Sequence, residues 1–259
     1  MGWAVFVPDI LRRRIDDMWE FIRAHPLHPR IVRRLEDTCF YRIIEIGRLP
    51  FNCAFITAMI ERWKLEMHTF HLSIGEITIT LQDVEILFGL SVDGLPVAYP
   101  HALREYTGLH YLEMLQWLIG FRPAEETALS GASRLQLTPV RQHMEAMDAY
   151  ITGDSPVLLI DRYMIFFMLL MFGRVLFPNT SENLFSLRFL HHLERLANLP
   201  RYNWGAVVLG FLHRQMRWAS MGTQRDVTRF LPLLQAIRLY LFYQLGLQMQ
   251  QHTDEEAAF

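Results

Sequence analysis

The longest apolar run in the chain constrains its fold more than any other feature. It extends from Tyr163 to Gly173, reads RYMIFFMLLMFGR with its flanking arginines Arg162 and Arg174, and has no charged residue between them. A helix needs about 20 apolar residues to cross a bilayer, so this run is too short to do so. A helix that is apolar on all sides is buried on all sides. We therefore predict a core helix over 156–177 with the other helices packed around it.

Periodic apolar residues predict helices on both sides of this run. Leu11, Ile15, Met18 and Ile22 recur at helical spacing, and similar patterns follow Asn52 and Asn203. Asn52, Asn203 and Ser155 precede these helices, where short polar side chains can accept hydrogen bonds from free backbone amides. A chain of 259 residues with 51% hydrophobic residues can bury a large core. The predicted fold class is mainly α, a single helical domain with a small β-hairpin.

The hairpin is predicted in the stretch HTFHLSIGEITITLQDVEILFGL, residues 68–90. Two short runs within 69–80 flank Gly75, which can supply a positive φ angle at a turn. Thr80 and Asp83 have the spacing of a capping box that begins a helix, and Gly89 is placed to end it. Every polar residue of the stretch can therefore have a structural role.

Two other segments lack periodicity. The stretch RPAEETALSGASRLQL, residues 122–137, has the composition of a mobile surface loop. The last residues, 246–259, are predicted to be a disordered tail.

Histidines are the first candidates for a catalytic or metal site. His68 and His71 lie three apart in a predicted strand, where they would face opposite sides, so we expect structural histidines and no metal. The sequence HHLERL at 191–196 lacks the spacing of a zinc protease motif. We also find no glycine-rich phosphate loop and no G-x-S-x-G nucleophile motif. These observations favour a protein without enzymatic activity and without a cofactor.

The basic residues are almost all of one type. Lys64 is the only lysine, and all other basic residues are arginine. Either genome composition or selection for bidentate ion pairs explains this bias.

Cys39 and Cys53 are the only cysteines, too few for a disulfide framework or a four-cysteine zinc site. The formal net charge of -2 argues against a generally basic nucleic-acid-binding domain.

A local basic patch nevertheless remains a candidate nucleic-acid contact. It comprises His213, Arg214, Arg217 and Trp218, followed by Arg225 and Arg229. Its arginines could contact phosphates while the indole of Trp218 stacks on a base. The alternative is a solvated helix face with the tryptophan turned inward. We single out Arg214, Arg217 and Trp218 as the candidate nucleic-acid contacts.

The stretch MIERWKLEMHTFHLSIGEITITLQDVEILFGLSVDGLPV resembles the signature of the plant mobile domain, a family of plant transposable elements and host proteins. The similarity continues through FYRIIEIGRLPFN, LIGFRP, RYMIFFMLLMFGRVLFPNTSENLFSLRFL and RYNWGAVVLGFLHRQMRWAS. Lys64 and Leu65 replace the usual Arg-Pro of the family. The family is sometimes labelled aminotransferase-like, but pyridoxal phosphate chemistry needs a Schiff-base lysine. Since relatives carry arginine where this chain has Lys64, the label does not indicate activity.

The resemblance implies a nuclear, non-enzymatic protein-interaction module that acts in transposon silencing, gene expression and meristem maintenance. The expected partners are nuclear proteins, among them a serine/threonine protein phosphatase-like protein, and no membrane. A transposon-derived nucleic-acid-binding domain is the alternative. The expected organisation is a helical extension over 1–35, the plant mobile domain over 36–245 and the tail. The candidate partner contacts are Glu61, Arg62, His68, His71 and Glu76.

Replacing both His68 and His71 by glutamine tests the structural interpretation of these histidines. We expect the double variant to have a lower melting temperature, while parent and variant purified without an affinity tag contain no metal by mass spectrometry. Stoichiometric zinc in the parent that disappears in the variant would contradict this interpretation.

Overall fold

The computed structural model of the chain describes residues 18–49, 52–73, 75–99, 101, 105–123, 133–178, 184–221 and 234. The predicted tail, the chain before Met18, and Arg225 and Arg229 lie outside these residues. Residues 18–24 are helical. The further α-helices are α2 (Pro29–Glu36), α3 (Tyr41–Ile46), α4 (Cys53–Glu61), α5 (Leu81–Phe88), α6 (Gly108–Ile119), α7 (Leu137–Asp148), α8 (Val157–Met171), α9 (Leu190–Leu193) and α10 (Trp204–Ser220). The mainly α fold class is confirmed.

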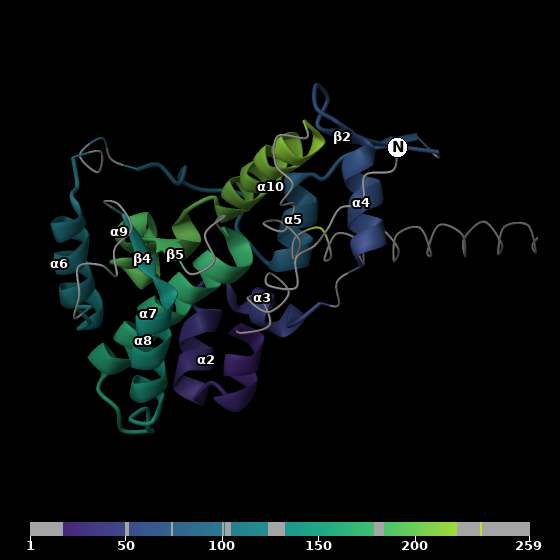
Figure 1. Ribbon diagram of the computed structural model, residues 1–259. Helices are drawn as coiled ribbons and strands as arrows, with labels where there is room; N and C mark the ends of the chain where they lie inside the picture. The colour runs from purple at the N-terminus through teal and green to yellow at the C-terminus, as the bar shows by residue number, and fades with distance from the viewer. Residues whose placement is uncertain are drawn as a thin grey trace, which may run out of the picture.

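The apolar run forms the centre of the molecule as predicted. Every residue from Tyr163 to Met171 in α8 is buried, and the helix continues as a π-helical segment, η3 (Phe172–Leu176). Helices α2, α6, α7 and α9 pack against α8, and Figure 1 shows α2, α7 and α8 together in the lower part of the molecule. Within the described residues, no helix is long and apolar enough to cross a membrane.

The start of α8 differs from the prediction. Pro156 is the N-cap and no side chain caps the helix. The Ser155 hydroxyl instead accepts a hydrogen bond from the Thr152 amide at 2.8 Å and donates one to the Tyr150 carbonyl at 3.0 Å. Ser155 therefore stabilises the turn before α8 rather than the helix itself.

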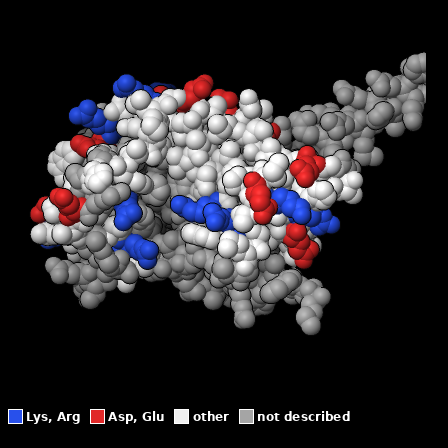
Figure 2. All heavy atoms as spheres, turned by 90° about the horizontal axis from the view of Figure 1, so that it is seen from above, with Lys and Arg blue, Asp and Glu red and all other residues white. Residues whose placement is uncertain are grey.

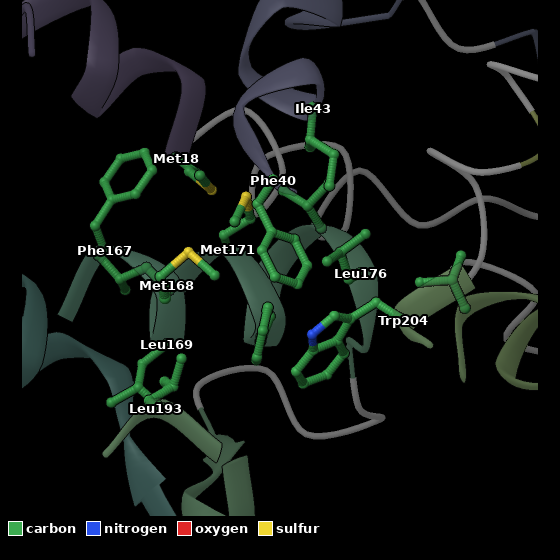
Figure 3. Packing of buried hydrophobic residues seen from close by; sticks show 14 of the residues in the cluster. Met18, Phe40, Ile43, Phe167, Met168, Leu169, Met171, Leu176, Leu193 and Trp204 are labelled. Atoms are coloured by element: carbon green, nitrogen blue, oxygen red, sulfur yellow. The ribbon is translucent and has the colours of Figure 1, made fainter. Parts of the chain in front are cut away.

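A cluster of aromatic rings joins η3 to the helices on either side. The ring centroids of Phe40, Phe172 and Trp204 are 5.1 to 5.3 Å apart, and Figure 3 shows Phe40 and Trp204 side by side. The Trp204 Nε1 group donates a hydrogen bond to the Leu199 carbonyl at 3.0 Å, so its polar atom is satisfied within the core. This cluster fixes the start of α10.

The predicted hairpin is the larger part of a three-stranded antiparallel sheet. Its strands are β1 (Trp63–Lys64), β2 (Thr69–Leu72) and β3 (Gly75–Ile77), in the order β1-β2-β3. Gly75 has the expected positive φ, 132°. The predicted end of the hairpin at residue 80 is wrong, because the chain leaves the sheet after Ile77 and prepares the start of α5. The two-residue strand β1 is too short to have a detectable period.

Local capping rules hold around this sheet. The Asn52 side chain caps α4 by accepting from the Phe55 amide at 2.9 Å. Thr80 and Asp83 form both hydrogen bonds of the capping box of α5, which ends at Gly89 in the left-handed conformation. Helix α10 packs against both α4 and α5. The sheet is therefore anchored to two helices that rest on α10.

A second, two-stranded sheet pairs distant parts of the chain. Strand β4 (Arg134–Gln136) pairs with β5 (Leu184–Ser186). The prediction of an irregular segment over 122–137 is wrong at its end, because β4 gains its hydrogen bonds from a strand far along the sequence. Two 3-10 segments, η4 (Leu187–Phe189) and η5 (Leu196–Arg201), flank α9.

The N-terminal helices are tied to α8 by arginines. Arg34 donates to Asp161 Oδ1 through Nε at 3.0 Å and Nη2 at 2.8 Å. Arg30 Nη1 donates to the carbonyls of Gly153 and Ser155 at 2.9 and 2.6 Å. Arg34 therefore forms an ion pair with α8, whereas Arg30 binds uncharged backbone carbonyls of the turn before it.

Two glycines of α10 provide a matched test of this packing. A Cβ at Gly205 would lie 2.7 Å from Val92 Cγ1, whereas a Cβ at Gly210 would meet no described atom within 4 Å. We expect Gly205→Ala to lower the free energy of unfolding by about 1–3 kcal/mol through overpacking. Gly210→Ala should raise it by about 0.5–1 kcal/mol, because alanine favours a helix interior. Urea unfolding followed by circular dichroism measures both, and equal effects would contradict the packing.

Candidate interaction surface

The candidate partner contacts are all exposed at one end of the molecule. Glu61 and Arg62 end α4, and Arg62 Nη1 donates to the Ala58 carbonyl at 3.0 Å. His71 and Glu76 are directly opposite each other on β2 and β3, with His71 Nδ1 3.3 Å from Glu76 Oε1. His71 therefore has a partner of the kind that we expect for a structural histidine.

His68 does not lie where strand alternation placed it. It belongs to the turn between β1 and β2 and has a left-handed backbone, with φ 53°. Such a conformation costs a non-glycine residue about 1–3 kcal/mol and persists only where surrounding contacts determine it. One such contact is the 2.8 Å hydrogen bond that the Thr78 hydroxyl donates to the His68 carbonyl. The prediction that His68 lies in a strand with His71 is therefore wrong.

The His68 ring stacks on a histidine of α10 rather than bonding to a carboxylate. The rings of His68 and His213 are nearly parallel, with centroids 4.8 Å apart and planes 5° apart. The Trp63 ring lies behind both, at 5.9 Å from His68 and 5.5 Å from His213. Burial and then the His68 imidazole lower the pKa of His213. Three rings from β1, the turn and α10 therefore form one cluster, which we call the histidine stack.

The histidine stack joins the two sets of candidate contacts. Arg214 and Arg217 follow His213 on α10 and are exposed, and Trp218 is half-buried. The Arg214 guanidinium lies over the rings of Phe211 and Trp218, at 5.3 and 5.8 Å from their centroids. The sequence had placed His213 in the basic patch but gave no signal that His68 would contact it.

Charges on this side of the molecule are mixed. Figure 2 shows Lys and Arg side chains near the centre of the visible face and acidic side chains interspersed with basic ones toward its edges. Such a pattern suits a local contact rather than a continuous basic surface.

Within the described residues, no three histidine, cysteine or carboxylate side chains come together where they could hold a metal ion. Burial raises the pKa of the Cys39 thiol to about 11, partly offset by a hydrogen bond with the backbone of Ser91. Cys39 is therefore a poor nucleophile at neutral pH.

His192 of α9 is a second unusual histidine. It is only 5% exposed, and neither ring nitrogen has a hydrogen-bond partner among the described residues. Its neighbours are the rings of Tyr99, His191, Tyr202 and Trp204, with centroids 5.2 to 5.9 Å away. Burial and then His191 lower its pKa to about 4. The spacing of HHLERL indicated no function, and the structure places His192 within the core.

Helix α6 presents a large apolar side chain to solvent. Trp117 is 66% exposed and Leu109, two turns earlier, is 52% exposed. Glu113 lies between them on the same side of the helix and is also exposed. We call Leu109, Glu113 and Trp117 the α6 stripe. Their four-residue spacing is visible in the sequence, but it does not distinguish an outward from an inward face.

Similarity to known proteins agrees with the signature residues. The chain belongs to the plant mobile domain family, whose family model matches residues 39–256. It is 32% identical to the Serine/threonine-protein phosphatase 7 long form homolog of Arabidopsis thaliana, over 83% of this chain and 15% of that protein. It is 29% identical to Protein MAIN-LIKE 1 of the same plant, over 74% of this chain and 36% of that protein.

A third Arabidopsis thaliana relative is Protein MAINTENANCE OF MERISTEMS, 29% identical over 82% of this chain and 41% of that protein. The chain thus spans less than half the length of these curated relatives. No solved structure matches the chain.

The burial of His192 predicts how stability depends on pH. A histidine whose pKa is lowered from 6.5 to about 4 on folding stabilises the fold above pH 6.5, and this contribution is lost as the pH falls toward 4. We expect His192→Phe to match or exceed the parent at neutral pH and to lose less stability on acidification. His143 and His213, whose pKa values are also lowered, should keep part of the dependence.

Melting temperatures between neutral pH and pH 4 measure this difference. Replacement of the exposed His101 by glutamine is the control and should leave the parent's pH dependence unchanged. An equally steep acid loss in His192→Phe and the parent would refute the assignment to His192.

Proposed function

We propose that the chain is a non-enzymatic protein-interaction module of a nuclear assembly that silences transposons and regulates gene expression, with a role in meristem maintenance. Membership of the plant mobile domain family supports this proposal. So does the similarity to a relative whose name is Protein MAINTENANCE OF MERISTEMS. The chain would supply one contact surface of a larger assembly.

The α6 stripe carries the proposal. Tryptophan is the side chain most enriched among residues that dominate protein interfaces, because it buries a large area with few rotatable bonds. Trp117 leaves about two-thirds of its surface in water, with Leu109 beside it on the same helix. An exposed apolar group of this size at a described helix face suits a protein partner. A nuclear protein, for example one related to serine/threonine protein phosphatases, is the partner we propose.

The sheet end of the molecule provides a polar contact in the same proposal. Arg62 and the His71–Glu76 pair are exposed there. Figure 1 places β2 and α6 at opposite ends of the molecule, so one small partner would not cover both. Polar groups of this kind contribute more to specificity than to affinity. The polar groups of the sheet end would therefore contribute specificity for a partner, and the α6 stripe would contribute most of the affinity.

The setting of Lys64 supports a role without catalysis. This lysine is exposed on β1, at an edge of the sheet. A Schiff-base lysine is normally activated by burial or by a neighbouring cation. An exposed edge strand provides no burial of that kind.

Proximity labelling in plant nuclei, followed by pull-down with the purified chain, tests the proposal. We expect Trp117→Ala to weaken capture of the labelled partner by at least about tenfold, as for other interface tryptophans. Ile86→Ala, at a 62% exposed position on α5, is the matched control and should capture the partner as the parent does.

Two results would overturn the proposal. One is an unchanged set of partners for Trp117→Ala, provided that its melting temperature equals that of the parent. The other is recovery of no nuclear protein together with turnover of a small substrate by the purified chain.

A further inference from the structure

The surface around the histidine stack differs from the α6 stripe in its chemistry and suits a different kind of ligand. His213 and Arg217 lie one helical turn apart, as do Arg214 and Trp218. The two pairs therefore form neighbouring ridges on the same side of α10. His68 is packed on the first ridge through its contact with His213. Two imidazoles, two guanidinium groups and one indole are gathered on this face.

His68 is held firmly although it is exposed. The hydrogen bond from Thr78 holds the left-handed main chain of His68, and the stack on His213 orients its ring. Trp63, behind the two imidazoles, is buried and supports them. An exposed flat ring that is already ordered loses little conformational entropy when another ring stacks on it.

The arginines of this face are also partly ordered. Arg214 lies over the rings of Phe211 and Trp218, an arrangement that leaves the edge of its planar guanidinium available for hydrogen bonds to an anion. Arg217 is exposed on the ridge that carries His213. Flat rings beside guanidinium groups suit a ligand that has both flat rings and phosphates.

We propose that this face, formed by His68, His213, Arg214, Arg217 and Trp218, binds single-stranded nucleic acid. An unpaired base stacks on the outer side of the His68 ring, and Arg214 and Arg217 contact the phosphates on either side of it. A duplex is a poorer ligand, because its bases are stacked on one another and turned away from a ring on the protein surface.

The acidic residues near this face limit the affinity. Glu61, Glu66 and Glu76 are exposed on or beside the sheet, close in sequence to His68 or its partners. They repel phosphates that lie far from the two arginines. The site is therefore short, and only a few nucleotides contact it.

Fluorescence anisotropy with the full chain tests this site. The probes are labelled oligo(dT) and oligo(U) of about 12 nucleotides, and a duplex of the same length. With two phosphates neutralised, raising the salt from about 50 to about 200 mM should weaken single-strand binding about sevenfold. The duplex should bind more weakly than either single strand.

Variants separate the ring from the charges. His68→Asn removes the ring, and asparagine tolerates the left-handed backbone better than most residues, so binding should fall about fivefold or more without loss of folding. The Arg214→Gln/Arg217→Gln pair should weaken binding and flatten its salt dependence. Arg23→Gln/Arg33→Gln removes the same charge from exposed positions at the N-terminal helices and should bind as the parent does. Circular dichroism verifies that each variant is folded.

Three outcomes would overturn the proposal. They are the absence of single-strand binding at low salt, equal loss of binding in the Arg214/Arg217 and Arg23/Arg33 variants, and equal competition by an oligoglutamate peptide of matched charge. The last result would show that the arginines recognise acidic chains in general. None of these outcomes bears on the α6 stripe, which lies at the other end of the molecule.

Discussion

The burial of α8 on every side is the constraint on which the other elements depend. A helix with consecutive apolar residues such as Phe166, Phe167 and Met168 has no face that can be left in water, so neighbours must cover its whole circumference. The packing of α2, α6, α7 and α9 satisfies that demand. The aromatic cluster of Phe40, Phe172 and Trp204 then extends the core from η3 to α10. Each of these helices has its inner face determined by α8 or by its continuation.

The outer faces follow from the same arrangement. Since α6 must cover α8 with Tyr111, Leu115 and neighbouring residues, Trp117 is turned outward. Since α10 buries Val208, Leu212 and Met216, its arginines are left at the surface. The sheet is then placed against α10, and His68 meets His213. The proposed contact surfaces are the sides that core packing leaves free.

Part of the fold was predictable from the sequence because it depends on interactions between residues close together in the chain. The Thr80–Asp83 capping box, the Asn52 cap and the turn at Gly75 each depend on residues a few positions apart, so their patterns are complete within a short window. The core helix was predictable because its composition alone excludes a solvent-facing side.

Contacts between distant segments were not predictable in the same way. His68 and His213 belong to different elements, and no local spacing relates them. Strand β4 has three residues and obtains its partner from β5, well after α8. Ser155 has the position of a capping residue before a helix. Its hydroxyl instead accepts a hydrogen bond from the Thr152 amide and donates one to the Tyr150 carbonyl. A tertiary contact decided the first two cases, and a competing local turn decided the third.

The arginine contacts to α8 concern a segment that precedes the family region. The family model begins at residue 39, yet Ile31 and Leu35 are fully buried, and Met18 and Phe21 belong to the same hydrophobic cluster. Arg34 and Arg30 fasten this segment to α8 and to the turn before it. The hydrophobic core of this chain therefore extends upstream of the segment that the family model matches, as far as Met18. A fragment of this chain that begins at residue 39 would therefore lack buried side chains that complete its core.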